Sequence, residues 1–403
     1  SFGQLVAQEL GRTERSIDAY TGKEPETPEI EADEFRVRNM SGASILSRNR
    51  RCRSNAIVYL AQKVHSSYGR DSYGSLSRSL QLLWENYLSI EQHTENTDLY
   101  VFHTGDFNRS DHEAFEGILG GSNFRGGIYM VDLSNSPFWA LPKANQGDHP
   151  DTDWYAYPLF SEGYRRMMHW YAIDIWQFFS KWNSFTGCSY RYLFRLDEDS
   201  FLHSPIRYDI FDFMKSGSYA YAYRMCAYEM QVTRRMWKEW KRRHASFEPK
   251  RDVELEMCGF YNNLFVADLD FFLSHPVQEF LTFIDRQGHI YRRRLGDLMI
   301  HSMVVYGFAE PSRIHRFIDF TYEHATLNQT SGCLAWGGIQ AGYNDPQASA
   351  TLDRFYQTHV LEKGCQANAS FLVHEDLSPS YSHLSISQRQ HLSLYTITAG
   401  RVE

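Results

Sequence analysis

The chain has 403 residues, of which 42% are hydrophobic, 22% charged and 15% aromatic. This composition is typical of a globular protein with a large core, and it excludes collagen, coiled coil and bulk disorder. The 41 Lys and Arg residues against 49 Asp and Glu give a formal net charge of −8, which argues against a nucleic-acid binder with a basic contact surface. No apolar run approaches the roughly 20 residues that a membrane-spanning helix needs.

Predicted strands and helices alternate along the middle of the chain. Short apolar runs at 56–61, 98–103, 192–196, 218–223 and 262–267 predict strands. Apolar residues three or four apart predict helices over 77–88, 163–180 and 269–285. This alternation predicts an α/β fold with a mostly parallel sheet between helices, in which ligands bind at the carboxyl ends of strands.

Composition changes mark the two ends. Residues 22–34 contain six acids and two prolines, which is typical of a stem or linker. Residues 376–403 are polar and rich in serine. We therefore expect an N-terminal stem at 1–50, a folded domain at 51–330 and a C-terminal wrap or tail at 331–403.

Six cysteines and four glycosylation sequons bear on the compartment. The cysteines form no CxxC pair, so a zinc ribbon or thioredoxin motif is not expected. The sequons begin at Asn39, Asn108, Asn328 and Asn368, and they favour the secretory pathway. In that case some cysteines are paired, Cys333 with another in the C-terminal third; the alternative is six buried thiols.

The segment Arg195-Leu-Asp-Glu-Asp199 carries the sharpest chemical signal. It follows a predicted strand directly, and Asp197 and Asp199 point to the same side of an extended chain. Two converging carboxylates suit Mg²⁺ or Mn²⁺ with phosphate oxygens. The alternative is a solvated acidic turn.

Six blocks follow one another between residues 52 and 326. They cover 56–63, 163–171, 193–199, 258–272, 295–302 and 314–325. In this order they resemble the fungal Golgi α-1,2-mannosyltransferases, glycosyltransferase family fifteen. The resemblance implies a GT-A-like nucleotide-sugar-binding fold with a single catalytic domain.

The resemblance also implies an activity. Members of this family are type II membrane proteins of the Golgi that move mannose from GDP-mannose to a glycan or glycoprotein acceptor, with Mn²⁺ as cofactor and with retention of the anomeric configuration. The expected partners are thus the nucleotide-sugar donor and the acceptor, and the expected membrane contact is an N-terminal anchor that precedes Ser1.

The family's site residues carry over by position. The implied metal ligands are Asp197, Asp199 and His324, and the implied catalytic residues include Arg195 and Asp297. The implied donor-binding residues are Tyr164, Arg195, Asp197, Asn263, Asp297 and His301. Several have plainer alternatives: a structural ion pair for Arg195, a helix N-cap for Asp297, and packing on a helix for Tyr164 and His301.

One departure from the family matters. Phe265 stands where the family has the glutamate proposed as nucleophile. Asp268, Asp270 or Glu256 could replace that carboxylate, and Asp268 is our candidate. Alternatively, transfer proceeds without an enzyme nucleophile, the donor differs, or the protein binds nucleotide or sugar without catalysis.

Overall fold

The computed structural model describes most of the middle of the chain. The described residues are 37–39, 53–64, 72–90, 93, 95–142, 145, 161–227, 233–254, 258–324, 327–328, 333–334 and 338–356. Most of the expected stem, the sequon at Asn368 and the serine-rich end lie outside them. No helix among these residues has the length and apolar character needed to cross a membrane.

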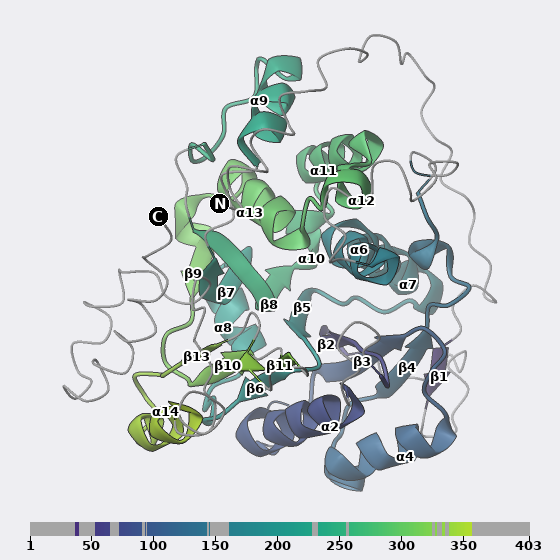
Figure 1. Ribbon diagram of the computed structural model, residues 1–403, viewed down its shortest axis with the longest axis vertical. Coiled ribbons are helices and arrows are strands. Elements are labelled where there is room, and N and C mark those ends of the chain that lie inside the picture. Colours follow the sequence, from purple (N-terminus) through teal and green to yellow (C-terminus); the bar gives the residue numbers. More distant parts are fainter. Residues whose placement is uncertain are drawn as a thin grey trace.

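Eight strands form the central sheet, in the order β1-β4-β3-β2-β5-β8-β7-β9 (Figure 1). In chain order they are β1 (Val37–Asn39), β2 (Asn55–Leu60), β3 (Thr97–His103), β4 (Ile128–Asp132), β5 (Tyr192–Leu196), β7 (Tyr221–Ala227), β8 (Gly259–Asp268) and β9 (Ile314–Arg316). Strands β1 and β8 pair antiparallel with their neighbours, and the other pairings are parallel. The mostly parallel α/β sheet predicted from the sequence is therefore confirmed.

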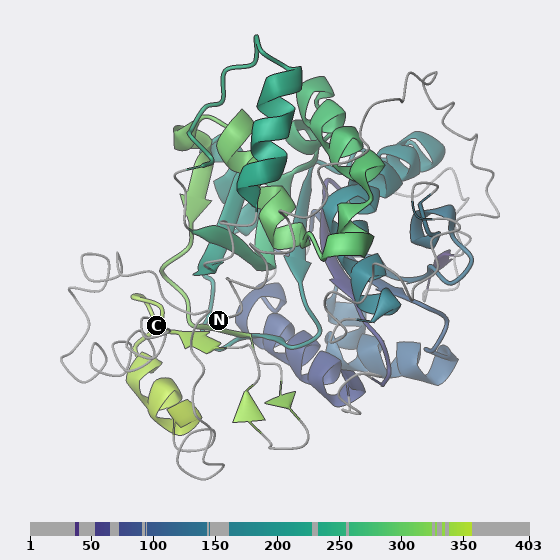
Figure 2. The same ribbon diagram turned by 45° about the horizontal axis from the view of Figure 1, so that its top comes forward.

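Helices cover the sheet on both sides. They are α2 (Ser72–Leu83), α4 (Arg109–Ile118), α6 (Glu162–His169), α7 (Ile175–Thr186), α8 (Ile210–Ser216), α9 (Arg234–Arg243), α10 (Leu269–Phe272), α11 (His275–Gln287), α12 (His289–Arg293), α13 (Asp297–Phe308) and α14 (Ala348–Tyr356). Figures 1 and 2 show α2 and α4 on one side of the strands and α6, α7 and α11 to α13 on the other. Short π-helical turns follow α2 and α6, and 3₁₀ turns lie at Gly121–Asn123, Pro137–Trp139 and Pro311–Arg313.

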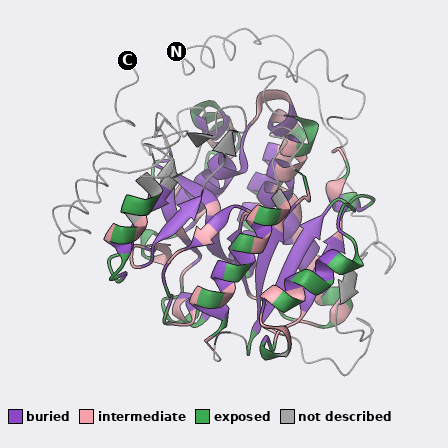
Figure 3. Cartoon of the chain, turned by 60° about the horizontal axis from the view of Figure 1, so that its bottom comes forward, coloured by how far each residue is buried: buried purple, intermediate pink, exposed green. Residues whose placement is uncertain are grey.

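The core is made of the apolar runs that predicted the strands. All seven residues of β3 and all five of β5 are buried, and Figure 3 shows the sheet buried beneath helices whose outer faces are exposed. Two predicted boundaries differ. The strand expected at 218 begins at Tyr221, because Ser218 has a φ of 53° and the chain turns there. The helix expected at 269–285 is split, because Pro276 lacks a backbone N–H and stands in the first turn of a new helix, α11.

A smaller sheet joins the C-terminal part of the chain to the acidic motif. Its strands are β13 (Gly338–Gln340), β10 (Tyr322–His324) and β6 (Ser200–Leu202), in that order; a separate two-stranded sheet pairs β11 (Leu327–Asn328) with β12 (Cys333–Leu334). The buried Arg224 guanidinium donates to the backbone carbonyls of Phe320, Gln340 and Ala341. These bonds fix the chain on either side of β10 to the core.

Candidate functional site

Two carboxylates and an imidazole meet beside the carboxyl end of β5. Asp197 and Asp199 follow this strand, and His324 ends β10, where it lies opposite Ser200 in the register with β6. One potential ligand atom from each of Asp197, Asp199 and His324 lies within 4.8 Å of the others. Strand pairing thus joins residues that are more than 120 positions apart in the sequence.

These three residues fit a divalent cation. His324 is 5% exposed and Asp199 6% exposed, and the buried His324 Nδ1 makes no hydrogen bond, although Asp199 Oδ1 lies 3.2 Å away. A buried imidazole nitrogen that faces carboxylate oxygens is a ready metal ligand, and mixed oxygen and imidazole ligands suit Mn²⁺. Burial and the neighbouring Asp199 raise the pKa of Asp197, against the opposing effects of Arg195 and His324.

Arg195 joins this cluster to a third carboxylate. Its Nε donates to Asp197 Oδ1 at 2.8 Å, and its Nη1 donates to Asp297 Oδ2 at 2.7 Å. The guanidinium lies 3.3 Å from the centre of the Tyr171 ring. Burial alone would lower the pKa of Arg195, but Asp197, Tyr171 and Asp297 hold it above its usual range. Arg195 is therefore a fixed positive charge at the base of the cluster.

Asn262 and Asn263 of β8 complete the network. Asn262 Nδ2 donates to Asp297 Oδ2 at 2.7 Å, and Asn263 Nδ2 donates to Asp197 Oδ2. The Asn263 carbonyl also accepts from the Asp197 backbone N–H at 3.1 Å. The structure thus places Asn263 and Asp297 next to the cluster.

Asp297 is not a helix N-cap. The N-cap of α13 is Gly296, and Asp297 is the first residue of the helix. An anion is favoured at this end of a helix, and Arg195 and Asn262 neutralise and orient the carboxylate. The capping alternative for Asp297 is therefore wrong.

Tyr164 faces an arginine side chain. It is the third residue of α6 and is partly exposed. The Arg294 guanidinium lies 5.9 Å from the centre of its ring. Arg294 has a φ of 51°, which is unusual for a residue with a side chain.

His301 lies beneath the cluster and not in it. Its side chain has no exposed surface; its Nε2 lies 2.9 Å from the Tyr171 carbonyl and its Nδ1 lies 3.3 Å from the Tyr221 hydroxyl. Burial lowers the pKa of His301 to about 4, so it is neutral near pH 7. Both ring nitrogens are engaged, so the expected donor contact by His301 does not fit the structure.

Asp268 is also misplaced for catalysis. It pairs in register with Tyr192 at the start of β5, whereas the cluster follows Leu196 at its end, a separation of about 13 Å at the rise of a strand. There its carboxylate caps α10 and pairs with Arg191 at 2.7 Å. The expectation that Asp268 replaces the family glutamate does not fit this position.

Phe265 packs in the core next to the cluster. Its side chain has no exposed surface, and it lies opposite Arg195 in the register of β5 and β8. Its ring centre is 5.3 Å from that of Tyr221 and 5.1 Å from that of His301. The ring forms part of the apolar floor under Arg195.

Sequence reasoning missed several residues of the site. Tyr171 supports Arg195, Asn262 holds Asp297, and Ser200 Oγ bonds the Asp197 backbone N–H and the Tyr322 hydroxyl. Both lie next to features that the sequence analysis used: Tyr171 is the last residue of one of the six family-like blocks, and Asn262 adjoins Asn263. The Ser200–Tyr322 contact depends on the pairing of β6 with β10, which the sequence did not reveal.

The fold and this site define the class of protein. The fold is similar to solved GT-A structures. Against core-mannan synthase A from Aspergillus fumigatus in its Mn/GDP form, the TM-score is 0.53 at 17% identity, over 76% of this chain and 83% of that one. Against the mannosyltransferase Ktr4p from S. cerevisiae in complex with GDP, it is 0.55 at 17% identity, over 86% and 85%. The chain has a GT-A fold with an acidic, histidine-containing cluster at the carboxyl end of its strands.

Sequence comparison shows similarity to one family over part of the chain. Residues 156–335 match the family described as glycolipid 2-alpha-mannosyltransferase. The chain is 25% identical over 168 residues to the probable mannosyltransferase KTR4 and 28% identical over 153 residues to the alpha-1,2 mannosyltransferase KTR1, both from Saccharomyces cerevisiae. These matches span 36% and 34% of this chain and 36% and 39% of those proteins. The chain is thus similar to this mannosyltransferase family over less than half of its length.

Proposed function

We propose that this protein is a Mn²⁺-dependent retaining glycosyltransferase that moves mannose from GDP-mannose to a glycan or glycoprotein acceptor. The observation that carries the proposal is the meeting of Asp197, Asp199 and His324 next to the fixed charge of Arg195. Similarity to the mannosyltransferase family supports mannose as the sugar, and similarity to a Mn/GDP-bound and a GDP-bound structure supports the nucleotide.

The chain's own residues divide the work. Asp197, Asp199 and His324 would hold the cation, whose chemistry is to offset the charge that develops on the departing diphosphate. Arg195 holds Asp197 and Asp297 in place and adds positive charge to a site of low dielectric. Asp297 and Asn263 contribute polar groups suited to sugar hydroxyls, and the partly exposed Tyr164 ring would add a contact to the donor.

Retention of configuration needs an account without a carboxylate at position 265. Phe265 has no proton to transfer and no lone pair to attack the sugar. We place the incoming acceptor on the same face as the departing diphosphate, with the fixed charges of the site stabilising the transition state. In this account Asp297 orients the sugar, and Phe265 supports Arg195 from below.

The disulfide-bonded cysteines of the chain support a location in the secretory pathway. Cys188 and Cys258 are both in disulfide bonds, and disulfides persist in oxidising compartments. We place the enzyme in the Golgi lumen, as a type II membrane protein. The sequon at Asn108 lies wholly in the described residues, and Asn108 is the N-cap of α4.

A donor screen tests the proposal. Purified protein with Mn²⁺ is offered GDP-mannose and, separately, UDP-glucose and UDP-galactose, with α-methyl mannoside as acceptor, and nucleotide release is recorded with and without EDTA. We expect EDTA-sensitive release of GDP from GDP-mannose and an α-linked product by NMR. Turnover of another donor would overturn the mannose assignment. Tight GDP binding without turnover, with a range of mannosides supplied, would favour a binder without catalysis.

A further inference from the structure

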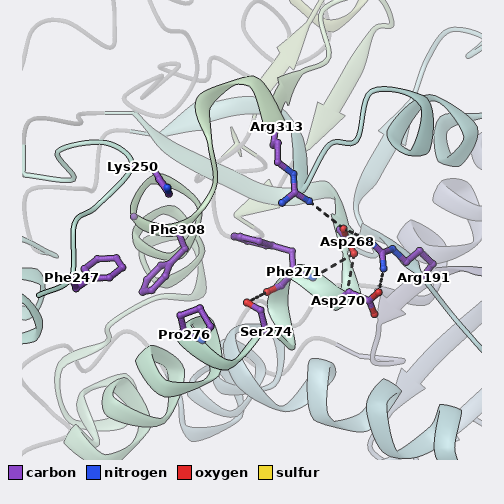
Figure 4. A pocket seen from close by; sticks show the side chains of 11 residues that line it. Arg191, Phe247, Lys250, Asp268, Asp270, Phe271, Ser274, Pro276, Phe308 and Arg313 are labelled. Carbon is purple, nitrogen blue, oxygen red and sulfur yellow. Dashed lines mark hydrogen bonds and ion pairs between the residues drawn. The ribbon is translucent and has the colours of Figure 1, made fainter. Parts of the chain in front are cut away.

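A cavity lies apart from the metal cluster. It encloses about 510 Å³ and is formed by the start of α11, the end of α13, the turn at Arg313 and the loop at Lys250 (Figure 4). Helix α13 connects the two places: Asp297 at its first residue lies in the cluster, and Phe308 at its last lines the cavity. Eleven residues of helix separate them by about 16 Å.

The cavity has an aromatic side. Phe247 and Phe308 pack with ring centres 4.7 Å apart, and Figure 4 shows them beside Pro276, with Phe271 between this side and the charged one. The Lys250 backbone N–H donates to the Gly307 carbonyl at 3.0 Å, which fixes the loop against the end of α13. The aromatic side is thus held in place by the backbone.

The opposite side is polar. Arg191 pairs with Asp268 and Asp270, and Arg313 Nη2 lies 3.5 Å from Asp268 Oδ2. Asp268 is 2% exposed, whereas the Asp270 side chain is 65% exposed and the Arg191 side chain 43%. Asp270 and Arg191 therefore present an acceptor and donors to a ligand while Asp268 holds the arrangement from below.

The charges of the cavity nearly balance. Lys250, the remaining basic group of the lining, pairs with Glu310 at 2.6 Å, so each cation at the cavity has an acidic partner. A balanced site gives no net attraction to phosphate or to an acidic glycan. It offers alternating donors and acceptors beside flat aromatic faces, which suits a ligand with many hydroxyl groups and an apolar ring face.

We propose that this cavity is a carbohydrate-binding site for a neutral hexose chain, separate from the site of transfer. Asp270 and Arg191 bind hydroxyl groups, and Phe247, Phe271 and Phe308 contact the C–H face of a pyranose ring. The ligand class follows from the cavity itself. We identify the bound chain as a distant branch of the acceptor, and this step rests on the proposed function. Such binding would raise the local concentration of acceptor.

Binding to an α-linked mannotriose is measured by calorimetry in EDTA, with maltotriose and a hyaluronan tetrasaccharide for comparison. The test variant is Asp270→Ala, and the matched control is Glu113→Ala, which removes another exposed carboxylate paired with an arginine. We expect mannotriose affinity to fall about tenfold or more in Asp270→Ala and to stay unchanged in Glu113→Ala. Equal affinities in wild type and Asp270→Ala, or preference for the acidic tetrasaccharide, would overturn the proposal.

Hydrogen exchange locates the ligand without relying on a variant. Mannotriose should protect segments 247–250, 268–276 and 307–313 in the full chain, and Phe247→Ala should weaken that protection. Protection confined to the metal cluster would overturn the proposal. Transfer to α-methyl mannoside tests the enzyme separately: loss of turnover with cavity binding intact contradicts the proposed function alone, and turnover without cavity binding contradicts this inference alone.

Discussion

Arg195 is the residue through which the cluster is organised. It bonds two carboxylates from different parts of the chain and rests on the Tyr171 ring. A buried arginine with this double pairing holds both acids at fixed positions before any ligand arrives. Pre-set charge of this kind is what makes an enzyme site effective in a low dielectric.

Arg195→Lys should lower kcat/KM for GDP-mannose about 100-fold. A lysine keeps the charge but has one nitrogen, so it loses the planar bridge in which two nitrogens bond Asp197 and Asp297, and it loses the stacking on Tyr171. The measurement is the initial rate of GDP release at saturating Mn²⁺. Arg125→Lys, which changes an exposed arginine paired with Glu95, is the control. A rate for Arg195→Lys equal to that of the control would show that the bridge is not needed.

Phe265→Leu should lower the stability of the fold and leave the catalytic activity nearly unchanged. The ring is fully buried against Tyr221 and His301, so its loss should lower the free energy of unfolding by about 1 to 2 kcal/mol. Turnover per folded molecule should stay within about threefold, because a buried ring does not touch the donor. Urea unfolding and GDP release are the two measurements. A collapse of kcat/KM with stability intact would mean that this ring contacts the sugar.

At the scale of the element, helices α6 and α7 form one helical unit that supports residues of the site. A π-helical turn, Trp170–Asp174, joins them, and around it lies a partly buried group of ion pairs. His169 Nδ1 is 2.6 Å from Asp174 Oδ2, and His169 Nε2 is 2.9 Å from Asp285 Oδ1 on α11. These ion pairs connect the helical unit, which carries Tyr164 and Tyr171, to α11.

His169→Gln should destabilise the protein by about 3 kcal/mol at pH 7, because two carboxylates lose the cation between them. Burial lowers the pKa of His169, but the two aspartates outweigh it and raise the pKa to about 10. The stabilisation is therefore complete below the unfolded pKa of about 6.5 and is lost as pH rises through 10.

Denaturant unfolding between pH 6 and 10 measures this effect. The free energy of unfolding of the wild type should decline over that range and approach that of His169→Gln near pH 10. Tyr291, whose ring centre is 5.6 Å from that of His169, also has a raised pKa, so its ionisation lies above this range. A constant difference between the two proteins across the range would rule out the charged histidine.

The strands and long helices were predictable, and the turns between them less so. Strand 192–196 was predicted at its observed bounds, because four of its five buried residues are apolar or aromatic. The split between α10 and α11 depends on Pro276, a signal present in the sequence but outweighed by the apolar spacing around it. Strand β4 and helix α4 were not predicted, although Asn108 and Asp111 form a capping box at the start of α4.

At the scale of the whole molecule, the site depends on two sheets. Asp197 and Asp199 follow strand β5 of the large sheet, and strand β10 of the small sheet places His324 beside them. A local motif in the sequence was enough to predict Asp197 and Asp199 as metal ligands. His324 and Asp297 came only from the resemblance, because nothing local distinguishes them. The burial of His301 and the distant position of Asp268 required the three-dimensional packing.

The central claim is that Asp197, Asp199 and His324 form a metal site for a nucleotide diphosphate, and calorimetry of GDP binding tests it most directly. Titrations are run with Mn²⁺ and with EDTA on wild type, on His324→Ala and on His203→Ala, a control that removes a nearby histidine paired with Glu323. We predict Mn²⁺-dependent GDP binding in wild type and His203→Ala, weakened at least about 100-fold in His324→Ala, since loss of even an outer partner of a metal ligand costs 10- to 100-fold. GDP binding that is unchanged by EDTA, or equal in His324→Ala and wild type, would contradict the account.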